Sequence, residues 1–274
     1  MSVAVTRRRV AAAVATVALL VPLSACGSDD SKQDAAAPSA GGSASASAAG
    51  EVKAADLTVL AASSLTDVFK TAGAAYEKAH PGTKVTFSFA GSQELAAQVK
   101  QGAPADALVT ADTKTMDGLM AETDDPKIIA KNRLVIAAGK GNPHKIGALK
   151  DLADTKLKVV LAAPEVPVGR YSKEILDKQG VTVKPVSQEP NVRAVLSKVE
   201  LGEADAGLVY KTDSAKSKDK VETVEIPDDQ NAVASYPAAS LKGSENADAA
   251  AAFVAWLSTP EAQKILQEAG FQQP

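Results

Sequence analysis

Short apolar stretches alternate with segments of helical periodicity along the chain from Leu57 onward. In the helical segments, apolar residues recur every three or four positions, as on the buried face of an amphipathic helix. The predicted strands are residues 57–61, 84–89, 107–111, 133–138, 158–162, 206–210, 221–226 and 236–240, with an extended segment at 181–186. The predicted helices are 64–79, from 92, 149–152, after 168, from 191 and 247–269. This alternation predicts parallel sheets with helices on both faces.

The part of the chain with this rhythm is about 220 residues long, which suits one large domain or two small lobes. We predict an α/β fold of two lobes, each a mainly parallel sheet flanked by helices, joined by two crossing strands. Lobe 1 is predicted at residues 54–137 plus 235–274, and lobe 2 at 138–234. A single larger doubly wound domain is the competing architecture.

The N-terminal segment has the features of an export signal. Arg7–Arg9 are basic, and the apolar run Val10–Val21 is shorter than the about 20 residues of a membrane anchor. Small residues then lead into Cys26, as at a lipoprotein processing site, so residues 1–25 are predicted to be a signal peptide and Cys26 the lipidated residue. An ordinary signal peptide that contains a cysteine is the alternative, and both the Sec and twin-arginine routes stay open. Residues 26–53 have little to bury and are predicted to be a flexible linker.

The charge balance excludes one class of partner. The chain has 30 Lys and Arg residues and 33 Asp and Glu residues; without the three arginines of the predicted signal, 27 basic residues remain and the net charge is −6. Nucleic-acid binding usually shows a basic footprint, so we expect no nucleic-acid partner. Any bound anion must be held by local donors. Cys26 is the only cysteine, so no intramolecular disulfide is expected.

The sequence has no clear catalytic or metal-binding pattern. His80 and His144 are the only histidines, and each lies beside a proline in a polar stretch typical of a surface loop. There is no Gly-x-Ser-x-Gly elbow, no Gly-Lys-Ser/Thr phosphate loop and no carboxylate–histidine cluster with metal-ligand spacing. We interpret Asp106 as a turn or capping carboxylate. We therefore predict no enzymatic activity, no cofactor and no direct metal ligands.

Four predicted helices begin in a loop of small residues directly after a strand. These loops are at residues 61–64, 90–92, 167–169 and 190–192. The first N–H groups of a helix have no intrahelical acceptor, and the helix dipole favours negative charge at that end. If the fold brings these helix starts to one cleft, uncharged donors can bind an oxyanion, joined by the hydroxyls of Ser64, Ser92 and Tyr210. Ser64-Leu-Thr-Asp67 is also a predicted N-capping pattern.

Six short motifs carry a family resemblance. They are Val59-Leu-Ala-Ala-Ser-Ser-Leu-Thr66, Phe89-Ala-Gly-Ser92, Gly102-Ala-Pro-Ala-Asp-Ala-Leu108, Val166-Pro-Val-Gly-Arg-Tyr171, Asn191-Val-Arg-Ala194 and Gly207-Leu-Val-Tyr210. In order and spacing they resemble the periplasmic molybdate-binding proteins of ABC importers, which are type II solute-binding proteins. The C-terminal Pro260-Glu-Ala-Gln263 and Gly270-Phe271 are similar to the end of that family. The resemblance covers roughly Leu57 to Phe271.

The resemblance implies a periplasmic-binding-protein-like fold with a tetrahedral oxyanion bound between two lobes. Ser64 and Ser92 match the two serines that donate from backbone and hydroxyl. Val168 and Val192 match two positions of the opposite lobe that donate through backbone N–H groups. Tyr210 matches the tyrosine whose hydroxyl completes the shell. In this interpretation the metal of the ligand is held only through its oxygen atoms.

Two positions depart from the family pattern. Gly91 stands where a serine is common, and Val168 where an alanine is common. Neither change removes a backbone donor, but the bulkier Val168 could alter the pocket volume. Ser63, beside the matched serine, is a weaker candidate.

A shell made only of donors suits an anion without a proton. Molybdate and tungstate are doubly charged and unprotonated at neutral pH, whereas phosphate carries a proton and would need an acceptor. Sulfate is also a pure acceptor, so a rigid site must reject it by size, since each stretched hydrogen bond costs on the order of 1 kcal/mol. We expect molybdate, with tungstate as an equally acceptable ligand; sulfate, thiosulfate or a small organic anion is the alternative.

Arg170 and Arg193 lie close to the predicted N–H donors. We predict that both face solvent or form salt bridges, because the residue after an N-terminal donor points away from the ligand. On this prediction, Arg193→Ala leaves the affinity within a few-fold, and a hundredfold loss would place the arginine in the site.

The predicted protein is a monomeric lipoprotein on the outer face of the cytoplasmic membrane, anchored at Cys26. Its partners are molybdate or tungstate and the membrane subunits of an ABC importer, which recognise lobes closed by a hinge motion. An enzyme of the same fold is a second alternative, but porphobilinogen deaminase-like proteins need a reactive cysteine beyond the lipidation site. A structural or adhesion lipoprotein is the third, and it leaves the four helix starts unexplained.

Overall fold

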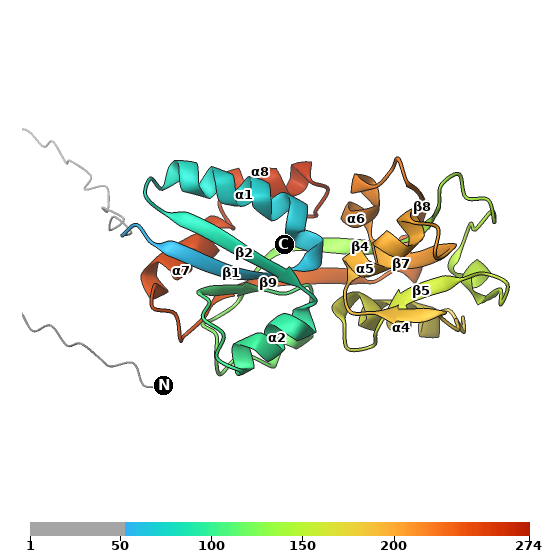
Figure 1. Ribbon diagram of the computed structural model, residues 1–274, viewed down its shortest axis with the longest axis horizontal. Coiled ribbons are helices and arrows are strands. Elements are labelled where there is room, and N and C mark those ends of the chain that lie inside the picture. The colour runs from blue at the N-terminus through green and yellow to red at the C-terminus, as the bar shows by residue number, and fades with distance from the viewer. Residues whose placement is uncertain (1–52) are drawn as a thin grey trace, which may run out of the picture. The chain divides into compact units, whose positions relative to one another are not determined.

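The computed structural model describes residues 53–274, which form a mixed α/β structure around one curled sheet (Figure 1). Its strands are β1 Asp56–Ala62, β2 Lys84–Ala90, β3 Ala107–Val109, β4 Lys127–Gly139, β5 Val159–Ala162, β6 Ser187–Glu189, β7 Ala206–Tyr210, β8 Val221–Glu225 and β9 Val233–Ser240. Its α-helices are α1 Thr66–Ala79, α2 Ser92–Lys100, α3 Thr113–Asp117, α4 Pro167–Lys178, α5 Val192–Glu200, α6 Lys211–Lys216, α7 Ala247–Trp256 and α8 Pro260–Glu268. Short 3-10 helices are η1 Ser63–Leu65, η2 Leu149–Ala153 and η3 Asp228–Gln230. The predicted signal peptide, Cys26 and nearly all of the predicted linker lie outside the described residues.

The sheet has two parallel halves joined by antiparallel strands. Its order is β2-β1-β3-β9-β4-β7-β5-β6, and β8 pairs with β4. Strand β1 is parallel to β2 and β3, and β5 is parallel to β6 and β7. Strand β4 pairs with β9 through residues 127–133 and with β7 and β8 through residues 134–139. The predicted fold class, two α/β lobes joined by two crossing strands, is confirmed.

We use lobe 1 for β1–β3 with α1, α2, α3, α7 and α8, and lobe 2 for β5–β7 with α4, α5 and α6. The predicted boundaries, after residues 137 and 234, both fall inside the strands β4 and β9 that run between the lobes. The division of the chain at those residues stays a prediction.

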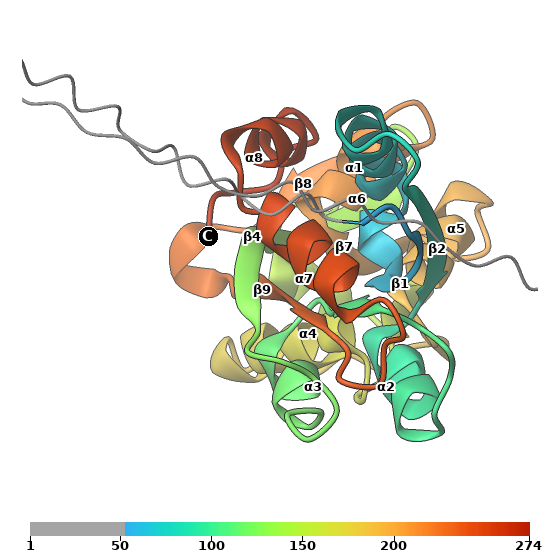
Figure 2. The same ribbon diagram turned by 90° about the vertical axis from the view of Figure 1, so that its left-hand side faces the viewer.

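The strand order places the connecting helices on opposite faces of each lobe. In lobe 1 the chain passes from β1 out to β2 through α1, and then back across β1 to β3 through α2. Because crossovers between parallel strands are right-handed, this reversal puts α1 and α2 on opposite faces, as Figure 2 shows. The same reversal in lobe 2 separates α4 from α5 (Figure 1). Ligands of such sheets bind where the helices diverge, at the carboxyl ends of the strands.

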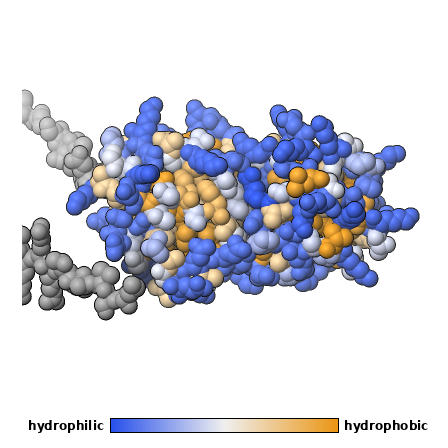
Figure 3. Space-filling model, viewed as in Figure 1, coloured by the Kyte–Doolittle hydropathy of each residue, from blue (hydrophilic) through white to orange (hydrophobic). Residues whose placement is uncertain are grey.

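The core follows the two-residue period of the strands. In β1, Leu57 and Val59 belong to the main core with residues of α1, α7 and lobe 2, whereas Leu60 packs into a second cluster with Leu95 and Val99 of α2. Each face of the lobe 1 sheet therefore has its own apolar layer. On the surface viewed in Figure 3, hydrophilic residues predominate, with an apolar area over the edge strand β2.

The predicted N-cap at Ser64 is wrong. Residues 63–65 form the tighter turn η1, and α1 begins after Leu65 without a side-chain cap. The Thr66 hydroxyl donates to the carbonyl oxygen of Ser63 at 2.7 Å. The Ser64 hydroxyl instead lies 3.1 Å from the hydroxyl of Tyr236 in the crossing strand β9. A tertiary contact thus replaces the expected local one.

Other local predictions also differ from the structure. Residues 181–186 form no strand, and the ladder with β5 begins only at Ser187, after Pro185, which lacks an N–H donor. The strand predicted at 107–111 ends at Val109. The helices α3 and α6 were not predicted, because five and six residues are too few to show a helical period.

Candidate functional site

Four helix starts converge on one small cavity between the lobes. The turn η1 and helix α2 reach it from lobe 1, and α4 and α5 reach it from lobe 2. The residues that line it are Ala62, Ser63, Ser64, Ala90, Gly91, Ser92, Ala111, Val166, Pro167, Val168, Asn191, Val192 and Tyr210. Its volume is about 10 Å³, about the room that one water molecule needs. The structure therefore brings all five predicted site residues, and Ser63, to one place.

Backbone N–H groups of lobe 2 are available at this cavity for a local reason. Helix α4 has Val166 as N-cap and Pro167 as its first residue, so no side chain caps the N–H of Val168. In α5 the Asn191 side chain accepts from Ala194 and leaves the N–H of Val192 to other acceptors. First-turn N–H groups have no intrahelical partner, and the helix dipole adds partial positive charge there. Lobe 2 thus presents two uncharged, electropositive ends.

The serine hydroxyls of lobe 1 have neighbours that can donate to their oxygens, which would leave their protons for a ligand. The backbone N–H of Ala111 donates to Ser92 Oγ at 3.0 Å. Ser64 Oγ lies 3.1 Å from the Tyr236 hydroxyl, which can donate to it in the same way. A hydroxyl that accepts through its oxygen still has its one proton to donate. Both serines are almost completely buried and can therefore act as oriented donors.

Tyr210 supplies the clearest sign of a missing partner. Its side chain is 1% exposed, and its hydroxyl has no hydrogen-bond partner among the described residues. Burial raises the pKa of Tyr210 well above its ordinary value, so the hydroxyl keeps its proton and acts as a donor. An unpaired buried hydroxyl costs on the order of 1–3 kcal/mol. Because Tyr210 lines the cavity, a bound acceptor would relieve that cost.

No side chain that lines the cavity is charged, although charges lie just outside it. Arg170 pairs with Asp112 and donates to Thr115 Oγ1 at 2.7 Å. Arg193 pairs with Asp67 at 2.6 Å and with Asp213 at 2.7 Å. The prediction that both arginines face solvent or form salt bridges is confirmed, and both form salt bridges. Their partners Asp112, Thr115 and Asp67 belong to lobe 1, so these ion pairs also join the lobes.

Gly91 marks a very close approach of the two lobes. A Cβ atom at this position would lie 2.4 Å from the carbonyl oxygen of Pro190 in lobe 2. The neighbouring Gln93 side chain donates to the same oxygen at 2.8 Å. The departure of Gly91 from the serine common in the family therefore has a steric explanation in this chain.

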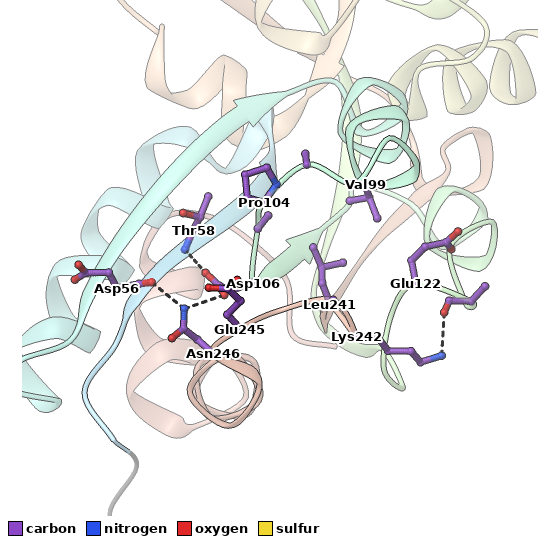
Figure 4. Close-up of a pocket in the computed structure, with 15 residues that line it drawn as sticks. Asp56, Thr58, Val99, Pro104, Asp106, Glu122, Leu241, Lys242, Glu245 and Asn246 are labelled. Atoms are coloured by element: carbon purple, nitrogen blue, oxygen red, sulfur yellow. Dashed lines mark hydrogen bonds between the residues drawn. The ribbon is translucent and has the colours of Figure 1, made fainter. Parts of the chain in front are cut away.

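A larger hollow of about 700 Å³ lies at the opposite end of the lobe 1 strands (Figure 4). Asp106 is buried beside it and accepts from the N–H of Thr58, the hydroxyl of Ser244 and the side-chain amide of Asn246. All of its partners are supplied by the protein, so Asp106 ties β1, β3 and the segment after β9 together. This agrees with the structural role predicted for it.

Other predicted features lie away from the cavity. His80 contacts the carbonyl oxygen of Tyr76 on α1, and the exposed His144 lies 3.2 Å from Asp205. Among residues 53–274, His, Cys, Asp and Glu form no group of three or more that could hold a metal ion. In the same range, no helix is long and apolar enough to cross a membrane.

The sequence did not reveal Tyr236, Asp67 or Asp213 as neighbours of the site. Tyr236 was assigned only to a crossing strand, and Asp213 lies in the short helix that was not predicted. The one available signal was the spacing, because Asp67 follows Ser64, and Asp213 follows Tyr210, by three residues. The spacing points to these aspartates only once the structure shows that both pair with Arg193.

The chain is similar to known proteins over almost its whole described length. Residues 57–272 match the family model of the bacterial extracellular solute-binding proteins. The molybdate-binding protein ModA of Mycobacterium tuberculosis is 39% identical over 261 residues, which cover 93% of this chain and 95% of that protein. The solved substrate-binding domain of a proposed molybdenum ABC transporter from Clostridium difficile is 30% identical with a TM-score of 0.60, over 80% of this chain and 99% of that one. The periplasmic molybdate-binding protein of Azotobacter vinelandii has a TM-score of 0.71 at 21% identity, over 80% and 99%, and supports the fold.

Proposed function

The chain belongs to the bacterial extracellular solute-binding proteins, and from this membership we propose that it captures molybdate outside the cytoplasm for an ABC importer. Relatives whose names specify molybdate binding are similar over nearly the full chain, which supports this ligand. In this proposal Cys26 carries the lipid anchor on the outer face of the cytoplasmic membrane. The protein acts as a monomer, without a cofactor, and hands its ligand to the importer's membrane subunits.

The observation that carries the proposal is the unpartnered Tyr210 hydroxyl, buried at a cavity that no charged side chain lines. We propose that this hydroxyl, the hydroxyls and N–H groups of Ser64 and Ser92, and the N–H groups of Val168 and Val192 surround one oxyanion. Molybdate accepts hydrogen bonds at every oxygen and carries no proton at neutral pH. A donor-only, uncharged shell satisfies it completely, and charge-assisted hydrogen bonds of this kind are the strong ones.

The same shell limits the choice of anion. A phosphate bearing a proton would leave that O–H without an acceptor, because no carboxylate lines the cavity. Tungstate has nearly the size of molybdate and should bind comparably. Sulfate is the second candidate, since it also accepts at every oxygen. Its shorter bonds would leave stretched contacts in a cavity held rigid from both lobes.

Isothermal titration tests the proposal directly. We expect molybdate to bind with one site per chain, tungstate to compete fully and sulfate to compete weakly. A thermal-shift panel provides an independent measure, because a ligand at 100 times its dissociation constant adds about 2.7 kcal/mol of stability. A chain that binds sulfate as tightly as molybdate would support the second candidate. A chain that binds neither would refute the proposal.

Lobe closure has its own test. Donors from both lobes must contact one small ion, so we propose that molybdate shifts the lobes toward the closed arrangement. Small-angle scattering should give a smaller radius of gyration with molybdate than without it. An unchanged radius of gyration would contradict the hinge motion. It would not bear on the predicted donors, which the titrations test.

A further inference from the structure

The guanidinium of Arg193 contacts carboxylates from two different helices. Its Nη2 donates to Asp67 Oδ2 on α1 of lobe 1 at 2.6 Å. Its Nε lies 2.7 Å from Asp213 Oδ1 on α6 of lobe 2. Arg193 itself is the second residue of α5. A single side chain thus connects three helices and both lobes.

Each of these helices begins at a predicted donor or within two residues after it. Asp67 lies three residues after Ser64, and Asp213 lies three residues after Tyr210. Arg193 follows Val192, whose N–H starts α5. The ion pairs therefore fix the relative positions of three chain segments that reach the cavity. The side chain of Arg193 does not line the cavity itself.

The two ion pairs differ in burial, and this difference separates their roles. Asp213 is completely buried, whereas the side chain of Asp67 is 42% exposed and that of Arg193 29%. A buried carboxylate needs its charge partner, so the Arg193–Asp213 pair belongs to the folding of lobe 2. Burial raises the pKa of Asp213 to about 7, and Arg193 opposes that rise. The Arg193–Asp67 pair spans the lobes, so moving the lobes apart would break it.

We propose that Arg193 is a positioning residue of the oxyanion site: anchored on Asp213, it grips Asp67 across the cleft and holds the Ser64, Val192 and Tyr210 segments around the ligand. The inference rests on the proposed function, since it needs an anion at this site. Arg193 contributes to the lifetime of the closed complex without touching the ligand. The pair between Arg170 and Asp112 is a separate contact between the lobes and shares no residue with the Arg193 pairs.

Asp67→Asn is the cleanest test, because its side chain is partly exposed and its loss leaves the buried Arg193–Asp213 pair in place. We expect molybdate to bind about fivefold more weakly, the range of a partly exposed ion pair. The loss should appear in the dissociation rate measured by stopped flow, with the association rate nearly unchanged. The thermal unfolding of the ligand-free protein should stay at its wild-type temperature.

Variants of Arg193 complete the test. Arg193→Gln leaves Asp213 without a partner, so Arg193→Gln/Asp213→Asn is measured beside it to keep the fold intact. Both should release molybdate about five- to tenfold faster, and Arg193→Lys should recover part of the loss. Adding Asp67→Asn to Arg193→Gln should weaken molybdate binding no further, because both changes break the same contact between Arg193 and Asp67. Lys173→Gln is the matched control: it breaks an exposed ion pair with Asp177 on α4 and should change nothing.

The outcomes separate this inference from the proposed function. Wild-type protein that binds no molybdate overturns both. Wild-type protein that binds molybdate, with Asp67→Asn and the Arg193 variants within twofold of it in affinity and release rate, overturns the role of Arg193 alone. Full additivity of Asp67→Asn and Arg193→Gln would also overturn it. A hundredfold loss in Arg193→Lys would place the arginine on the ligand, against the geometry described above.

Discussion

The cavity between the lobes and the larger hollow of lobe 1 lie at opposite ends of the same parallel strands. The cavity of about 10 Å³ adjoins the carboxyl ends of β1 and β2 and is lined by helix starts without a charged side chain. The hollow of about 700 Å³ adjoins the amino ends, where α2 finishes and Asp56, Asp106, Glu122 and Glu245 gather. Size alone would favour the hollow as a binding site.

Strand direction explains the difference. In a sheet with parallel strands and connecting helices, helix N-termini collect at the carboxyl edge and helix C-termini at the amino edge. The first edge is electropositive without any charged residue. At the second edge α2 ends and α7 begins, so the negative charge there comes from Asp56, Asp106, Glu122 and Glu245, which outnumber Lys242. A dianion is therefore expected at the small cavity and repelled from the large hollow. The predictions below test this contrast from the largest effect to the smallest.

Introducing a carboxylate into the cavity should abolish binding. We expect Ser92→Asp to weaken molybdate binding by at least about 1000-fold, because like charges 4 Å apart near a protein surface repel by about 4 kcal/mol. Isothermal titration measures the loss. The matched control is Ala103→Asp at the larger hollow, which should bind like the wild type. Equal losses of molybdate affinity in Ser92→Asp and Ala103→Asp would mean that the cavity is not the preferred site for the anion.

Removing one backbone donor should have the next largest effect. Val192 is the first residue of α5, where proline is tolerated, and the preceding Asn191 is extended as proline requires. We expect Val192→Pro to weaken binding by about 10- to 150-fold, since a hydrogen bond to a charged group is worth about 1.5–3 kcal/mol. Val192→Ala keeps the N–H and should stay close to the wild type. Similar molybdate affinities for the two variants would mean that the N–H of Val192 does not bind the ligand.

Tyr210→Phe should separate affinity from stability. Loss of the hydroxyl should weaken molybdate binding by about tenfold. The ligand-free protein should become slightly more stable in chemical denaturation, because the variant no longer buries an unpaired hydroxyl. A variant less stable than the wild type without ligand would mean that the hydroxyl has a structural partner instead.

Tyr236→Phe should cause a smaller loss of about two- to tenfold, the range of a neutral hydrogen bond. The phenol does not line the cavity, but it orients the Ser64 hydroxyl. Combined with Ser64→Ala, the change should add almost nothing, and titration of the four proteins measures this coupling. Additive losses would mean that Tyr236 acts independently of Ser64.

Asp213 should affect the pH dependence of stability more than affinity. Its pKa is raised by burial from 3.8 to about 7, so the folded state holds a proton that the unfolded state has lost between those values. Protonation of Asp213 therefore stabilises the folded state. This stabilisation is fully present below about pH 4 and is lost as pH rises through about 7. In between, the free energy of unfolding falls by at most about 1.4 kcal/mol per pH unit. Relative to the wild type, Asp213→Asn should therefore gain stability from pH 5 to pH 8 in urea denaturation. Parallel stability curves would contradict this.

Much of the fold and of the candidate site could be predicted because it depends on local patterns. The strands and long helices follow from periodicity, and the four small-residue loops directly after strands located the helix starts that line the cavity. The short helices α3 and α6 and the true end of β3 could not be predicted from such windows. The partners of the arginines could not be predicted either, because Asp67 and Arg193 are 126 residues apart.

The sequence alone determined the order of strands and helices, the candidate donors and the absence of a charged residue among them. Only the tertiary structure decided that these donors meet, that Tyr236 accompanies Ser64, that Gly91 must stay small, and that Arg193 connects the lobes. The physical reason is that helix dipoles and hydrogen-bonding groups are local properties of a segment. Their convergence on one point depends instead on the reversal of chain direction in two sheets and on how closely two lobes approach.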